Sequence, residues 1–254
     1  MRLTPETHGH LGWNKQVGFE FARHVTFQAL AADEIERIAQ SVAVGFRQEA
    51  GRWRAVALFS SVPDQNWFVT PDGLWRAAAV PAALRVYPFC LDPDAPTALS
   101  LWRGYEPSPV ANAEQPFYLN DQLTEVLGTT LGFLQTVHVG IMSLHAPLHL
   151  LENAGAMVAW ALPRPTTEKA NEGLSGVYRI DPDAFKKLSD EDWLKLRRLN
   201  AIGWIHAHLA SMHHVERFGA GPRPLPSSTA PNELPKSTTE GASAFLAALS
   251  NDLG

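Results

Sequence analysis

The chain has almost no cysteine. Cys90 is the single cysteine among 254 residues, so an internal disulfide is impossible and a Cys-x-x-Cys redox or zinc motif is absent. Its neighbours in "YPFCLD" are mainly apolar, which predicts a small buried side chain. This cysteine usage fits a reducing compartment, and the first residues lack the continuous apolar run of a secretory signal. We therefore expect a cytoplasmic protein.

Long apolar runs and an excess of positive charge are also missing. No stretch approaches the roughly 20 consecutive apolar residues of a membrane span, so we expect none. The formal net charge of −5 disfavours general binding to phosphate backbones, and we expect no nucleic-acid partner. A Gly-rich phosphate loop and a Gly-x-Ser-x-Gly elbow are absent too, which removes the common nucleotide-binding and hydrolase motifs.

The residues that are present predict a globular fold with a sheet in its first half. Hydrophobic residues make up 45% of the chain, with 8 Trp and 12 Phe, which is enough for a substantial core. From Val17 to about Leu101, short apolar runs separated by turn signals predict β-strands, among them "LWRAAAVPAALRVYPFCL". One helix interrupts this series at "LAADEIERIAQ".

The second half is mainly helical by its apolar spacing. Five residues share one helix face and predict a helix over residues 121–143: Leu123, Leu127, Leu131, Leu134 and Ile141. Pro147 marks the first turn of a second helix, and "AMVAWAL" and "LSGVYRI" predict a pair of strands. Asp181 and Ser189 predict the N-caps of two further helices. The sequence therefore predicts an α+β fold, with an antiparallel sheet in the N-terminal half packed by helices from the C-terminal half.

Composition divides the chain into three parts. We expect residues 1–16 to be a flexible N-terminus and residues 17–218 to form one domain. Residues 219–254 are rich in Pro, Ser and Thr, a composition that predicts a disordered tail. The last residues, "ASAFLAALSNDL", have an amphipathic spacing, so they form either a short docking helix or a frayed end.

The stretch "HAHLASMHH", residues 206–214, holds four of the ten histidines. Histidines that share a metal ion on a helix stand three or four residues apart, and no pair here has that separation. A metal centre in this segment alone is therefore not expected, and no metal ligand is assigned. The helical wheel places His206 and His213 beside the apolar stripe, and His208 and His214 away from it.

Two interpretations of the histidines remain open. In the first, they are partly buried and hydrogen-bonded to a carboxylate or a carbonyl. In the second, His138 and His145, which continue the stripe of the helix over residues 121–143, face His206 and His213 and form a metal or acid/base site between two helices.

Five residues are candidates for binding a ligand. Arg85 is a charge in the apolar segment "PAALRVYPF" and needs either a carboxylate partner, such as Asp181 or Asp92, or an anionic ligand. Tryptophans, Trp75 among them, either fill the core or line a surface for a sugar or a peptide. The candidates are Arg85, Tyr87, Trp75, Asp181 and His206.

Two blocks of the sequence resemble a known family. "VPAALRVYPF" (80–89) is similar to a segment of the bacterial SapC-like family that ends in Arg, a basic residue and Tyr-Pro-Phe. "LSGVYRIDPDAFKKLSDEDWLKLRRLNAIGWIHAHLASM" (174–212) resembles the family's "L-x-G-x-Y-x-I-D" block and the helix after it, which ends in "H-L-x-S". The chain departs from the family pattern at Val86, where a basic residue is usual, and at Pro182 and Asp183.

The resemblance implies a protein linked to a surface-layer gene cluster, or to nutrient uptake or peptide modification, without a defined reaction. Our first hypothesis is an accessory or binding protein in which Arg85 and nearby aromatic residues hold an acidic or peptide ligand. The alternative is a metal-dependent or acid/base enzyme acting on a peptide or sugar, with His206 or His138 as base or ligand. We expect a protein, peptide or small-molecule partner, and neither cofactor nor oligomeric state is assigned.

Overall fold

The computed structural model describes residues 1–165 and 173–220. The described residues lie in the first of the chain's two units, Met1–Arg223. Every element below belongs to the first unit. The tail expected over residues 219–254, with its terminal helix, lies outside the described residues except for Gly219 and Ala220, at the end of α9 (Glu216–Gly219).

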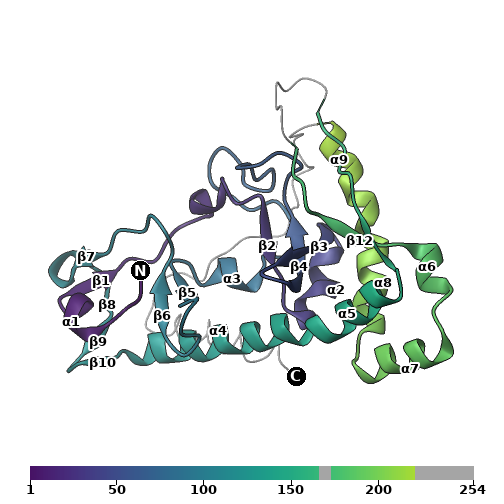
Figure 1. Cartoon of the computed structure of the whole chain (residues 1–254). Coiled ribbons are helices and arrows are strands. Elements are labelled where there is room, and N and C mark those ends of the chain that lie inside the picture. The colour runs from purple at the N-terminus through teal and green to yellow at the C-terminus, as the bar shows by residue number, and fades with distance from the viewer. Residues whose placement is uncertain (166–172, 221–254) are drawn as a thin grey trace. The chain divides into compact units, whose positions relative to one another are not determined.

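A five-stranded antiparallel sheet lies at the centre of the first unit (Figure 1). Its order is β11 (Met157–Ala159), β12 (Tyr178–Ile180), β3 (Ala43–Glu49), β4 (Arg52–Leu58) and β2 (Phe27–Ala29). The two strands predicted in the second half are β11 and β12, and they pair with each other and then with β3. The α+β class and the antiparallel sheet are confirmed, and the second half of the chain contributes to that sheet as well as covering it.

The hairpin of β3 and β4 forms the middle of the sheet. Glu49 pairs with Arg52, so Ala50 and Gly51 alone make the turn, with φ of 48° and 72°. Positive φ at both positions matches a two-residue hairpin turn whose twist suits antiparallel strands. Residues Ala43 to Phe46 are all buried, which shows that the start of β3 is covered on both faces.

Helices pack against this sheet in the places that the sequence predicts. The segment "LAADEIERIAQ" forms η2 (Ala32–Glu34) and α2 (Ile35–Ala39), and the second half adds α5 (His145–Asn153) and α8 (Ile202–Ser211). After α8 the chain continues as η4 (Met212–Val215). Both predicted caps are confirmed: Asp181 accepts two backbone N–H groups of α6 (Pro182–Lys186), and Ser189 accepts one from α7 (Asp190–Arg198).

A second core lies beside the sheet, around the hairpin of β5 (Phe89–Leu91) and β6 (Leu99–Leu101). Leu127 and Leu134 of α4 (Glu125–Ser143) pack into it, and Val137 of the same helix packs with Ala31 and Ala82. Figure 1 shows α4 running along one side of the unit, from this second core toward the central sheet. The helix predicted over residues 121–143 is confirmed from Glu125 onward, whereas Gln122 and Leu123 form a short strand.

The composition of α4 and α5 bears on the expectation that the chain contains no membrane-spanning stretch. No Asp, Glu, Lys or Arg stands between Glu125 and Glu152. Within the described residues, the helical stretch Glu125–Asn153 is long and apolar enough for a span by length and composition, with a mean hydropathy of 1.2. Uncharged Gly, Thr and Ser interrupt its apolar residues, which is why no continuous apolar run is visible in the sequence. Only 17% of its most apolar window is buried.

Residues 1–16 form regular structure where the sequence predicts a flexible segment. They contain α1 (Pro5–His8) and β1 (Leu11–Trp13), and β1 pairs with β7 (Ser108–Pro109) and β8 (Gln115–Pro116). Leu3 and His8 are 5% and 2% exposed. The remaining short elements are η1 (Glu20–Ala22), η3 (Val110–Asn112), β9 (Tyr118–Leu119) and β10 (Gln122–Leu123).

The strand predicted through Arg85 is wrong. Residues Ala82–Arg85 form a one-turn helix, α3, directly after Pro81. Ala, Leu and Arg are among the strongest helix formers, and this local preference outweighs the apolar run that suggested a strand. Arg85 is therefore the last residue of a helix, and Tyr87 follows in the connection to β5.

Candidate functional site

The five candidate residues fall into two separate groups. Trp75, Arg85 and Tyr87 belong to the segment between β4 and β5. Asp181 and His206 both contact α6: Asp181 precedes this helix as its N-cap, and the ring of His206, in α8, lies 5.9 Å from the ring of Phe185. Within the described residues these two groups come from different parts of the fold, so we treat them as two sites.

Trp75 and Tyr87 are connected by two phenylalanines. The Phe19 ring lies 5.4 Å from Trp75 and 6.0 Å from Phe21. Phe21 then stacks on Tyr87 with 3.7 Å between ring centroids and 14° between planes. This series begins in the core, because Trp75 also packs on the fully buried Phe59.

The outer part of this series is half-exposed. Trp102 lies 5.7 Å from Phe21 and 5.6 Å from Tyr87, and Tyr105 lies 5.8 Å from Tyr87. We call the five half-exposed residues Phe19, Phe21, Tyr87, Trp102 and Tyr105 the aromatic surface. Three segments distant in sequence build it, so it exists only in the folded chain.

Trp75 supports this surface from below. It is 8% exposed, and its indole N–H donates to the carbonyl of Ala79 at 2.9 Å. A buried tryptophan with its polar atom satisfied fills the core, which is the structural alternative considered for it. Tyr87 is more accessible, and burial on one side, followed by the neighbouring Tyr105, raises the pKa of its hydroxyl. It therefore stays protonated near neutral pH, as a donor and acceptor.

Arg85 lies against α4. Its guanidinium carbon is 5.6 Å from the centre of the Phe133 ring. Burial raises the pKa of Glu34, and the positive charge of Arg85 works against that rise. Glu34 is thus a buried carboxylate whose pKa Arg85 influences. The sequence analysis had named Asp181 or Asp92 as the possible carboxylate partner of Arg85.

Glu34 also fixes the start of α3. Its two carboxylate oxygens accept the backbone N–H groups of Ala31 at 3.0 Å and of Ala82 at 2.8 Å. Hydrogen bonds to a buried carboxylate are stronger than neutral ones. Since α3 leads directly to Tyr87, this carboxylate anchors one segment of the aromatic surface.

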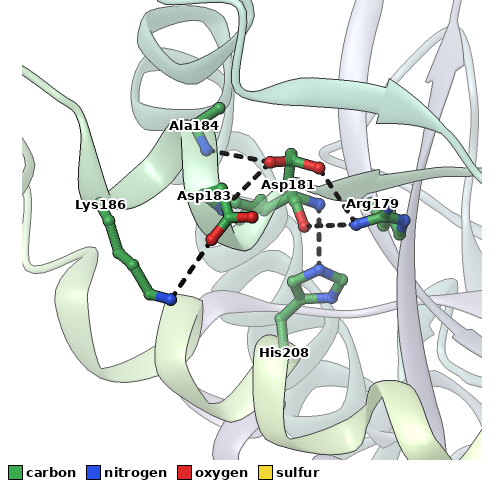
Figure 2. A network of polar contacts seen from close by, with 7 residues as sticks. Arg179, Asp181, Asp183, Ala184, Lys186 and His208 are labelled. Carbon is green, nitrogen blue, oxygen red and sulfur yellow. Dashed lines mark hydrogen bonds and ion pairs between the residues drawn. The ribbon is translucent and has the colours of Figure 1, made fainter.

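Asp181 belongs to a network at the end of β12 (Figure 2). It accepts the N–H groups of Asp183 and Ala184 at 3.0 and 2.9 Å, and lies 3.7 Å from the Arg179 guanidinium. The hydrogen bond from Ala184 is the largest of the causes that lower its pKa. These contacts describe a helix cap with an adjacent ion pair, and they occupy the carboxylate within the chain.

The predicted orientation of the histidines is wrong. His206 and His213 are exposed, whereas His208 and His214 are 0% and 6% exposed. The apolar stripe expected from the sequence comprised Ile202, Ile205, Leu209 and Met212. Of these four, α8 buries Ile205, together with Trp204, His208 and Ser211.

After Ser211 the chain tightens into the 3₁₀ turn η4, which has 3.0 residues per turn. This change of period rotates His214 inward, where Nε2 bonds the carbonyl of Ala39 at 3.1 Å. Within residues 1–165 and 173–220, no three His, Cys, Asp or Glu side chains are grouped closely enough to hold a metal ion. The metal form of the two-helix histidine site considered from the sequence is therefore not assembled among these residues.

A groove of about 420 Å³ lies between α5 and α7. His149 and Asn153 line one wall, and Asp192 and Lys195 line the other. Lys195 is paired with Glu191 at 2.7 Å and lies 3.7 Å from Asp192. None of the five candidate residues lines this groove.

Sequence reasoning missed Phe19, Phe21 and Tyr105. The only available signal was composition, because aromatic residues recur in the first 105 residues without a period that marks a common face. Their meeting depends on a contact between distant loops, in which the Phe19 N–H donates to the carbonyl of Gly73 at 2.7 Å. Gly18 has φ of 83° there, and a Cβ at this position would meet that carbonyl at 2.9 Å.

Comparison with known proteins agrees with the resemblance seen in the sequence. The family model described as SapC matches residues 3–218, which includes the segment before residue 17, both cores and the aromatic surface. No curated protein and no solved structure matches the chain. Because the match covers most of the chain, this protein belongs to the SapC family.

Proposed function

We propose that this SapC-family protein is a non-catalytic accessory protein that binds a peptide or a segment of a partner protein through its aromatic surface. The observation that carries the proposal is the gathering of Phe21, Tyr87 and Trp102 in a half-exposed stack. Half-exposed Tyr and Trp side chains with buried supports are the residues that supply most of the binding energy in protein interfaces.

The surroundings of the aromatic surface support a peptide ligand. Val17 and Leu74 are 83% and 51% exposed, and the bond from Phe19 to Gly73 brings their segments together beside Phe19. The exposed Arg103 and the ion pair of Arg23 with Glu20 add charge nearby. An apolar centre with charged neighbours is typical of a surface that takes an extended or helical segment of protein.

The pathway is part of the proposal. The resemblance to the family implies a role linked to a surface-layer gene cluster, or to nutrient uptake or peptide modification, and recognition of peptide segments fits each of these pathways. The enzyme hypothesis has less support, because His206 is exposed beside Phe185 and no group of three His, Cys, Asp or Glu side chains in the described residues could hold a metal ion.

Selection from a random peptide library on the full chain tests the proposal. We expect selected peptides to bind the unaltered protein and to lose at least about tenfold in affinity when Trp102→Ala or Tyr87→Ala is introduced, since such anchors each contribute on the order of 2 kcal/mol. Trp193→Ala is the matched control, because Trp193 is a half-exposed tryptophan that packs on Phe185 of α6. Circular dichroism shows whether each variant is folded.

Two results would contradict the proposal. One is a selection that enriches no peptide above background. The other is a set of peptides whose affinity falls equally in the Trp193 variant, or stays unchanged in the Tyr87 and Trp102 variants.

A further inference from the structure

Two histidines of α5 have the separation that the histidines of α8 and η4 lack. His145 and His149 are four residues apart, and their rings lie 6.0 Å apart on the same helix. Residues separated by four positions project from one face of a helix, one turn apart. This is the spacing with which helical histidine pairs bind one metal ion.

Each ring has a nitrogen available for a metal ion. The side-chain amide nitrogen of Asn153 lies 2.9 Å from Nδ1 of the exposed His149 ring. A half-turn of this amide places its oxygen beside Nδ1, and the proton then resides on Nδ1 while Nε2 is free. An Asn amide can present its oxygen to an Nδ1–H group, which leaves the Nε2 lone pair directed outward. The Nδ1 atom of His145 is buried without a hydrogen-bond partner, while the residue as a whole is half-exposed, so Nε2 is the nitrogen that we assign to the metal ion.

The observed ring separation is close to what a shared ion requires. Imidazole nitrogens bind Zn²⁺ at about 2.0–2.1 Å, so two rings on one ion have centroids about 5 Å apart. Side-chain rotation that closes about 1 Å between the rings is sufficient, and His149 has room to turn because it lines the groove between α5 and α7. The charge of Lys195 across the groove is compensated by Glu191 at 2.7 Å.

We propose that His145 and His149 bind one divalent transition-metal ion, of the class of Zn²⁺, Ni²⁺ or Cu²⁺. Neutral imidazole suits these three ions, whereas Mg²⁺ and Ca²⁺ prefer oxygen ligands. Two protein ligands leave the other coordination positions to water or to a small molecule in the groove. This site is independent of the aromatic surface and of the proposed function.

Titration calorimetry of the full chain with ZnCl₂, without a histidine tag, tests the proposal. We expect one equivalent of Zn²⁺ to bind, with a dissociation constant in the micromolar range. His145→Ala and His149→Ala each leave a single imidazole, so each weakens binding by about tenfold or more. His206→Ala and His213→Ala are matched controls, since both residues are exposed and have no histidine four residues away.

Electron paramagnetic resonance with Cu²⁺ gives a second readout that does not depend on affinity. The unaltered chain should show hyperfine coupling to two imidazole nitrogens, and the His145 and His149 variants to one. The proposal is overturned if Zn²⁺ fails to bind below about 100 µM. It is also overturned if the affinity is unchanged in both α5 variants, or falls equally in the His206 or His213 variant.

Discussion

The buried imidazole of His208 replaces a contact between two strands. Its Nε2 accepts the backbone N–H of Ile180 in β12 at 3.1 Å, and its Nδ1–H donates to the carbonyl of Val44 in β3 at 2.8 Å. Tyr178 pairs with Phe46 in these strands, so Ile180 and Val44 stand opposite each other two residues further along. The ring therefore extends the pairing of β12 and β3 where the backbones no longer meet, and Figure 2 shows its bond to the chain beside Asp181.

Replacing His208 removes both hydrogen bonds at once. We expect His208→Ala to lower the free energy of unfolding by roughly 3–5 kcal/mol, because it leaves a cavity and two buried polar groups unpaired. His208→Gln keeps one donor and one acceptor, so it should restore part of that loss. Urea unfolding followed by circular dichroism measures both. Equal stability of the alanine variant and the unaltered chain would contradict this role.

At the scale of single residues, the sequence indicated that α8 has a buried face, but it did not indicate which histidine lies on that face. The apolar stripe of α8 was visible, but a rotation of about one residue decides whether His206 or His208 faces the core. That rotation is set by Phe46 and Trp160, whose rings lie 4.6 and 6.1 Å from His208 and which come from other elements. A helical wheel contains no information about such neighbours.

The helix α4 shows how neighbours decide the role of a glycine. Gly132 is exposed, and a Cβ there would meet no atom within 4 Å. At Gly140, a Cβ would lie 2.8 Å from the Cβ of Ala31, because the helix approaches η2 closely at that point. The same residue type therefore weakens the helix at one position and permits packing at the other.

These two glycines give a matched pair of substitutions. We expect Gly132→Ala to raise the free energy of unfolding by up to about 1 kcal/mol, since alanine is the better helix former. Gly140→Ala should lower it by roughly 1–3 kcal/mol, since the added methyl group forces α4 and Ala31 apart. Chemical denaturation compares the two variants with the unaltered chain. A Gly140 variant as stable as the Gly132 variant would show that the contact with Ala31 is not tight.

At the scale of elements, local signals were sufficient where they agreed with one another. The caps at Asp181 and Ser189 and the long stripe of α4 were predicted and are observed. The segment through Arg85 combined helix-forming residues with an apolar run, and there the apolar run was given too much weight. The pairing of β1 with β7 and β8 joins segments about a hundred residues apart, which no local pattern reveals.

For the molecule as a whole, His208 predicts a loss of stability in acid. Complete burial lowers the pKa of its imidazole from 6.5 to about 4. The unfolded chain therefore takes up a proton near pH 6.5 while the folded chain stays neutral. The contribution of His208 is fully present above pH 6.5 and is lost as the pH falls toward 4, and this difference in pKa corresponds to roughly 3 kcal/mol.

Thermal unfolding between pH 4 and pH 7 tests this dependence. We expect the melting temperature of the unaltered chain to fall across that range, and to fall less in the His208→Gln variant, which has no group that titrates there. Parallel curves for the two proteins would mean that other groups cause the acid sensitivity.

The fold class could be predicted for the whole molecule, whereas the assembly of the candidate site could not. The α+β class was predicted from strands followed by helices, because the hydrophobic periodicity of each element can be recognised in the local sequence alone. The aromatic surface depends on contacts between loops that are distant in the sequence. These contacts connect Trp75 to Tyr87 through Phe19 and Phe21, and they do not involve Asp181.

The uncharged stretch between Glu125 and Glu152 has a consequence for the synthesis of the chain. Its helix α4 packs on η2, α3, β4 and β5, and all four precede it in the sequence. A chain made from its N-terminus therefore completes these partners before α4 leaves the ribosome. We expect the buried face of the helix, with Leu127, Leu134 and Val137, to pack soon after the helix emerges. Early packing shortens the time in which chaperones or the membrane-insertion machinery encounter that face exposed.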